Sequence, residues 1–104
     1  MSYEAPLKVL SGTALTDEQK KDLLNRLARV EGQVRGVRKL LAKAVVPDDC
    51  DGVAQQMAAA RKALDRAFVN LLTSSMVTHT SGSTSLEDAA DRAKHLSEML
   101  NKFA

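Results

Sequence analysis

Three side chains in this chain of 104 residues could bind a transition metal or react with an electrophile: Cys50, His79 and His95. Thiolate and imidazole are ligands for copper, nickel, cobalt and zinc, and a thiol is also a nucleophile. Cys50 and His79 lie 29 residues apart along a segment with a helical pattern, a span of about 43 Å at 1.5 Å per residue. They therefore cannot meet within one protomer, whereas an antiparallel copy of the same helix would bring them together.

No other pattern points to catalysis. The sequence lacks a glycine-rich phosphate loop, a paired-carboxylate pattern and a nucleophile elbow. A lone cysteine cannot form an internal disulfide, no apolar run approaches 18 residues, and the N-terminus has no secretory pattern. We therefore expect a cytoplasmic protein that is neither an enzyme nor bound to a membrane.

Positive charge is concentrated in one segment. Residues 20–43 carry eight Lys or Arg against two acidic residues, a net charge of +6, whereas the whole chain carries +2. Arginine binds phosphate groups through two parallel hydrogen bonds. Aromatic residues make up 3% of the chain, too few for stacking on single strands, so the pattern favours double-stranded DNA. Arg61, Lys62 and Arg66 could extend this surface.

Two glycines interrupt the same segment, which reads RLARVEGQVRGVR over residues 26–38. Glycine costs roughly 1 kcal/mol relative to alanine inside a helix, so Gly32 and Gly36 require a reason. Four residues apart, they lie on one helix face and permit close approach by a DNA backbone or by a neighbouring dimer.

Three helices are predicted to position these residues, within a single helical domain over residues 16–104 that follows a flexible arm over residues 1–15. Thr16 opens a capping box, after which apolar residues recur at steps of four and three. A second helix with this spacing starts near Asp49, and a polar loop over residues 78–84 precedes a third, capped by Ser85. The three apolar stripes comprise Leu23, Leu27, Val30, Val34, Val37, Leu41 and Ala44, then Val53, Met57, Ala60, Leu64, Ala67 and Leu71, then Ala89, Ala93, Leu96 and Leu100.

The predicted fold class is all-α, with a protomer of two long antiparallel helices and a short C-terminal helix. Each long helix has about 29 residues, and the third is too short to cover the second along its length. The apolar stripes therefore need another partner. A symmetric dimer that forms an antiparallel four-helix bundle is the economical solution.

Two segments, RLARVEGQVRGVRKLL and VAQQMAAARKALDRAFVNLL, together with a cysteine that opens the second helix, resemble the copper-sensitive operon repressor family. This family includes CsoR, the nickel and cobalt sensor RcnR and the formaldehyde sensor FrmR. The resemblance implies an all-α repressor, a homodimer or a dimer-of-dimers homotetramer, that binds double-stranded operator DNA until a small effector releases it. By position, the implied DNA-binding set is Arg26, Arg29, Gln33, Arg35, Arg38, Lys39 and Arg61.

The resemblance also implies an effector site shared across the dimer. Cys50 matches the family's cysteine, and His79 matches a further ligand 29 residues later, so a Cu, Ni, Co or Zn ion is the implied effector. The family's intervening histidine corresponds to Ser75, whose hydroxyl is a poor ligand for copper(I) or nickel(II). His95 is an additional candidate ligand.

Two alternatives stay open at this point. The chain could be a thiol-based sensor of formaldehyde or another electrophile through Cys50, since the formaldehyde-sensing branch relies on this cysteine together with the N-terminal amine. The chain could also be a helical oligomeric interaction module without DNA binding, because the two apolar stripes by themselves predict self-association.

Overall fold

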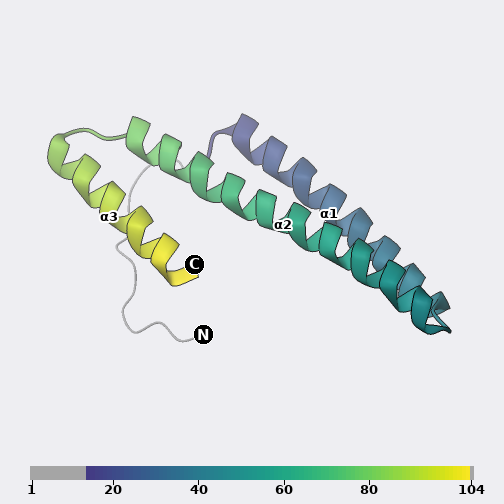
Figure 1. The fold of residues 1–104 in the computed structure, drawn as a ribbon. Helices are drawn as coiled ribbons and strands as arrows, with labels where there is room; N and C mark the ends of the chain where they lie inside the picture. Colours follow the sequence, from purple (N-terminus) through teal and green to yellow (C-terminus); the bar gives the residue numbers. More distant parts are fainter. Residues whose placement is uncertain (1–13, 104) are drawn as a thin grey trace. The chain divides into compact units, whose positions relative to one another are not determined.

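Three α-helices make up most of the computed structural model, which describes residues 14–103 (Figure 1). They are α1 (Asp17–Lys43), α2 (Pro47–Ser81) and α3 (Leu86–Phe103), and residues 14–103 contain no strand, so the predicted all-α class and helix order are confirmed. Most of the predicted N-terminal arm, residues 1–13, lies outside the described residues. The chain divides into two units, a hairpin unit over residues 17–71 and a second unit, called the C-terminal unit, whose described residues are 14–16 and 72–103.

Local hydrogen bonds explain where the first two helices begin. Acidic Asp17 and Glu18 occupy the first turn of α1, where they complement the helix dipole. Pro47 is the first residue of α2, two residues earlier than predicted, since proline needs no N–H partner at that position. Asp49 then accepts hydrogen bonds from the backbone N–H groups of Val45 and Val46 at 3.0 and 3.1 Å. These two bonds lower the pKa of Asp49.

The predicted loop over residues 78–84 is wrong in its first four residues, because α2 continues as far as Ser81. The hydroxyl of Thr80 donates to the carbonyl of Met76 at 2.7 Å, a bond that threonine makes inside a helix. The helix ends at Ser81, and the N–H of Gly82 directly after it donates to the carbonyl of Thr78 at 3.1 Å. As a result α2 has 35 residues and carries His79 in its last turn.

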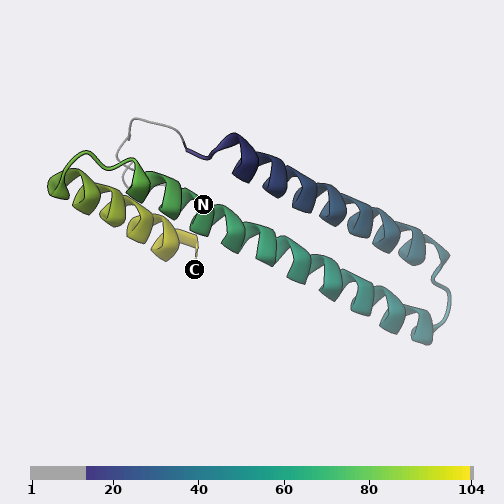
Figure 2. The ribbon, with the colours of Figure 1, turned by 90° about the horizontal axis from the view of Figure 1, so that it is seen from above.

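Within the hairpin unit, α1 and the first part of α2 run antiparallel and side by side (Figures 1 and 2). Each predicted stripe divides into two alternating sets. One set is buried between the helices and comprises Val30, Val37, Val53, Ala60 and Ala67, with exposed fractions of 2–7%. The other set stays on the surface, with exposed fractions of 36–57%, and comprises Leu27, Val34, Leu41, Met57, Leu64 and Leu71.

The exposed set forms one flank of the hairpin, which we call the apolar flank. Its members lie four residues after, or three residues before, a buried residue on both helices, as Leu64 lies four residues after Ala60. In an antiparallel pair of right-handed helices, equivalent rotations away from the contact line point to the same side. A protomer alone therefore leaves a continuous apolar surface beside its own core.

In the C-terminal unit, the predicted cap of the third helix is confirmed. The hydroxyl of Ser85 accepts from the N–H of Asp88 at 3.0 Å, and the Asp88 carboxylate accepts from the N–H of Thr84 at 3.0 Å. Leu96 is buried as predicted, but Ala93 is exposed and Arg92 is buried in its place. The guanidinium of Arg92 tolerates burial because it pairs with the carboxylate of Asp88 at 2.9 Å.

Candidate functional site

A shallow basic groove lies between the two helices of the hairpin unit. Three predicted residues on α1 line it, namely Arg26, Arg29 and Gln33, together with Ala63 and Arg66 of α2. The groove has a volume of about 200 Å³, and three arginines and a glutamine are among the residues that line it. Such a set of donors fits a phosphate group.

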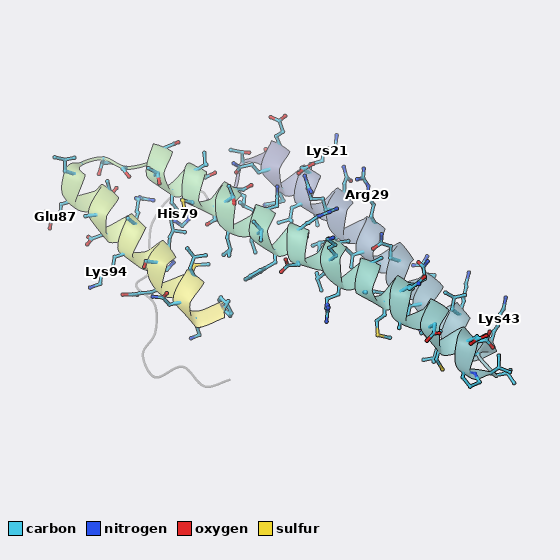
Figure 3. The ribbon with its side chains drawn as sticks, in the orientation of Figure 1. Lys21, Arg29, Lys43, His79, Glu87 and Lys94 are labelled. Carbon is cyan, nitrogen blue, oxygen red and sulfur yellow. The ribbon has the colours of Figure 1, made fainter. Side chains whose placement is uncertain are left out.

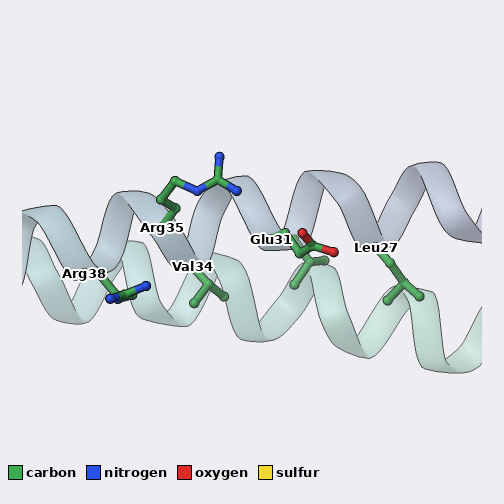
Figure 4. Close-up of a pocket in the computed structure, with 6 residues that line it drawn as sticks. Leu27, Glu31, Val34, Arg35 and Arg38 are labelled. Atoms are coloured by element: carbon green, nitrogen blue, oxygen red, sulfur yellow. The ribbon is translucent and has the colours of Figure 1, made fainter.

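Two more predicted arginines, Arg35 and Arg38, line a separate and larger hollow of about 410 Å³ together with Leu27, Glu31 and Val34. Figure 4 shows Val34 and Leu27 on the same side of α1, while Arg35 points to the opposite side. This hollow therefore belongs to the edge of the apolar flank. The predicted DNA-binding arginines thus divide between two flanks of the hairpin.

Most of these basic side chains form no ion pair with an acidic side chain among the described residues. Among the described residues, Arg26 pairs with Asp22 at 3.0 Å, an exposed pair of small energetic value. Neither Arg29 nor Arg35 has an ion pair or hydrogen bond in that part of the chain. Figure 3 shows the side chains of Lys21 and Arg29 on α1. Lys39 and Arg61 are also exposed.

The sequence pattern suggested Arg66 as an extension of the basic surface but did not place it with Arg26 and Arg29. The signal that does so is its register. Arg66 immediately precedes buried Ala67, just as Arg29 immediately precedes buried Val30. In an antiparallel pair, these positions lie on the same flank. Arg61 instead follows buried Ala60, which places it on the apolar side.

Gly32 and Gly36 are exposed on α1, and the structure contains no heavy atom within 4 Å of a Cβ built at either position. Packing within the described protomer therefore does not require glycine at these positions. If the glycines have a steric role, it concerns something outside the protomer.

Cys50 lies in the first turn of α2, in the hairpin unit, with its thiol exposed. It lines an open apolar hollow of about 430 Å³ with the residues of the α1–α2 connection, from Ala44 to Pro47. An exposed thiol beside an apolar hollow is accessible to a small effector or to a ligand from another chain.

His79 contacts His95, and their ring centres lie 6.3 Å apart with the ring planes tilted by 31°. Both residues belong to the C-terminal unit, His79 at the end of α2 and His95 in the middle of α3. Figure 3 shows His79 on the side of α2 that faces α3. Ser75 lies one helical turn before His79 and is half-buried. The Nδ1 atoms of both histidines are shielded from solvent and have no hydrogen-bond partner within residues 14–103.

The surroundings of His79 favour a neutral imidazole. Desolvation lowers the pKa of His79, and the positive charges of Arg92 and His95 lower it further. A neutral ring keeps a lone pair on one nitrogen, which is the form that binds a metal ion.

Among residues 14–103, no three His, Cys, Asp or Glu side chains converge to hold a metal ion. The donors that do fit a transition metal are the two imidazoles and the exposed thiol, and their chemistry suits Zn, Ni, Co or Cu. The described residues of one chain therefore do not by themselves bring three such ligands together.

No helix of the described chain is long and apolar enough to cross a membrane. No significant similarity to a curated protein or to a solved structure was found. A family model described as metal-sensitive transcriptional repressor matches residues 19–104, well over half of the chain. The match covers α2, α3 and all of α1 except its first two residues. The resemblance inferred from the two sequence segments is thereby confirmed, and the chain belongs to the family of metal-sensitive transcriptional repressors.

Proposed function

We propose that this repressor binds operator DNA through the basic surface of the hairpin unit and is released by a transition metal ion. The observation that carries the DNA part is the groove in which Arg26, Arg29 and Arg66 converge. Their guanidinium groups come from two helices and surround an opening that a phosphate can enter. Arg35, Arg38 and Lys39 add positive charge nearby on α1.

The repressor acts as a homodimer or a larger oligomer in this proposal. The apolar flank supports it, because six apolar side chains on two helices stay 36–57% exposed in the protomer. Burying a Leu, Val or Met side chain is worth about 1.5–3 kcal/mol relative to leaving it exposed. A second copy supplies a matching flank, since a two-fold axis places the same surface on both partners. The result is an antiparallel four-helix bundle.

The metal ion is bound in this proposal by Cys50 of one copy and His79 of another. Both residues lie on α2, in its first and last turns respectively. Antiparallel α2 helices place the first turn of one beside the last turn of the other, which joins a thiolate and an imidazole at each end of the bundle. Cu, Ni, Co and Zn ions all accept this pair of ligands.

DNA binding is tested by fluorescence anisotropy with a duplex from the protein's own promoter region. The slope of log affinity against log salt is about −0.9 for each neutralised phosphate. Arg29→Ala should reduce the slope by about 1, whereas Lys94→Ala, an exposed lysine on α3, should leave it unchanged. An intact oligomer that fails to bind this DNA at low salt would identify the chain as an interaction module instead.

The effector is tested with Cys50→Ala, which should bind DNA normally and no longer respond to metal. A second candidate, a thiol sensor of formaldehyde or another electrophile, is favoured by the exposure of Cys50. Native mass spectrometry separates the two, because a metal ion and a covalent adduct on Cys50 differ in mass. If Cys50→Ala is still fully released by the effector, both candidates fail.

A further inference from the structure

We propose that His95 of α3 is a metal ligand of the sensing site and binds the same ion as His79. This inference rests on the proposed metal-sensing function and extends it to α3. His95 then supplies the imidazole that is missing at position 75, where the sequence has a serine. The ion is of the class that imidazole and thiolate prefer, namely Zn, Ni, Co or Cu.

The distance between the two rings suits one ion. Metal–nitrogen bonds are about 2.0–2.1 Å, so two nitrogens on one ion lie no more than about 4.2 Å apart. Each ring centre lies behind its nitrogen, which makes the observed separation of 6.3 Å between the centres compatible with a shared ion. The two residues belong to one unit, on helices joined by a four-residue connection, so their approach is a local property of the fold.

The hydrogen bonding of the pair also points to a ligand. A buried ring nitrogen normally has a hydrogen-bond partner. Here both Nδ1 atoms are shielded from solvent and have no hydrogen-bond partner among the described residues. Two apolar side chains at this contact would have avoided leaving these nitrogens unpaired. A metal ion is a partner that imidazole nitrogen accepts in place of a hydrogen bond.

The charge around the pair favours an anionic third ligand. Arg92 is 7% exposed, and its positive charge acts on His79, although Asp88 pairs with the guanidinium at 2.9 Å. A dication joins this environment more readily with a thiolate than with a neutral donor. Cys50 of the partner subunit meets that requirement, since α2 carries an exposed thiol in its first turn.

Other ligands from α3 are less suitable. Asp91 and Glu98 lie about one helical turn on either side of His95 and line a hollow with it. No set of three ligands converges there among the described residues. We therefore place the third ligand on a second copy of the chain.

The experiment uses the 104-residue chain, Zn(II) and long-range ¹H–¹⁵N NMR of the imidazole rings. The chain contains two histidines, so one variant, His95→Gln, assigns both sets of signals. One equivalent of Zn(II) per protomer should shift a nitrogen of each ring. In competition with a chromophoric chelator, His95→Gln should weaken Ni(II) binding at least tenfold, because the loss of even an outer-shell partner costs about 10–100-fold.

Ser97→Gln is the matched control, since Ser97 is an exposed residue of α3 two positions from His95. It should bind Ni(II) with unchanged affinity. A shift of the His79 ring without a shift of the His95 ring overturns this inference and leaves the proposed metal sensing intact. If neither ring responds to Zn(II), metal sensing through His79 fails as well.

Discussion

Replacing the two exposed glycines of α1 separates stability from DNA binding. Gly32→Ala and Gly36→Ala each add a methyl group that meets no heavy atom within 4 Å. Alanine is favoured over glycine by about 1 kcal/mol in a helix interior, so each substitution should stabilise the protein by that amount. For a chain of this size, 1 kcal/mol corresponds to an increase in Tm of about 4–8 °C.

The same methyl groups should weaken DNA binding. In the proposed function, DNA binds the basic surface of the hairpin unit, and Gly32 and Gly36 lie on α1 between and beside Arg29 and Arg35 in the sequence. A Cβ at the point of closest approach moves the helix away from the phosphates. A hydrogen bond to a charged group is worth about 1.5–3 kcal/mol. The loss of one such bond reduces the affinity at least about tenfold.

Thermal unfolding by circular dichroism and anisotropy with the promoter duplex measure the two effects. Gly52→Ala is the matched control, because Gly52 is an exposed helical glycine of α2 with the same open surroundings. It should raise Tm without changing the affinity for DNA. Unchanged affinity in the α1 variants would show that DNA does not approach this face. A lower Tm together with a smaller oligomer would show that the face packs against another copy.

Two further predictions concern the oligomer and the C-terminal unit. Leu64→Glu should break the oligomer in sedimentation experiments because it places a charge on the apolar flank, whereas Ala58→Glu, at an exposed position of α2 about 120° away around the helix, should not; an intact Leu64→Glu dimer would move the interface elsewhere. The side-chain hydrogen bond from Arg92 and the backbone N–H of Thr84 lower the pKa of Asp88 below 3.8. The ionised carboxylate therefore stabilises the fold above that pH. This contribution to stability disappears as the pH falls through the lowered pKa. Asp88→Asn should therefore make the NMR signals of α3 less sensitive to acid below about pH 4, and an unchanged acid transition would contradict this role.

The positions of the helices could be predicted from the sequence because caps and apolar spacing are local signals. The cap at Ser85 and the buried positions of Val30 and Val37 follow from them directly. The end of α2 was not accessible in this way. Threonine, the residue at positions 78 and 80, occurs in loops as well as in helices. The hydrogen bond from the Thr80 hydroxyl to the Met76 carbonyl forms once the helix has formed. The helix continues through most of the polar run and stops directly before Gly82.

The candidate site could be predicted only in part from the sequence. The type and spacing of residues identified Cys50, His79 and the arginines of α1 as candidates. Which side chains meet depends on register across two helices, and a list of charges does not contain that information. Arg66 therefore joins Arg26 and Arg29 only after the buried positions of both helices are known. The contact of His79 with His95 depends in addition on the extra turn of α2.

One helix carries a residue of every proposed site. Along α2, Cys50 lies in the first turn, Leu64 on the apolar flank, Arg66 in the basic groove and His79 in the last turn. A metal ion bound at the ends of α2 therefore acts on the helix that supplies one side of the groove. For such coupling, the factor by which the metal weakens DNA binding must equal the factor by which DNA weakens metal binding. A groove formed by two helices, rather than by α1 alone, gives the metal a direct means to change the spacing between Arg66 and the arginines of α1.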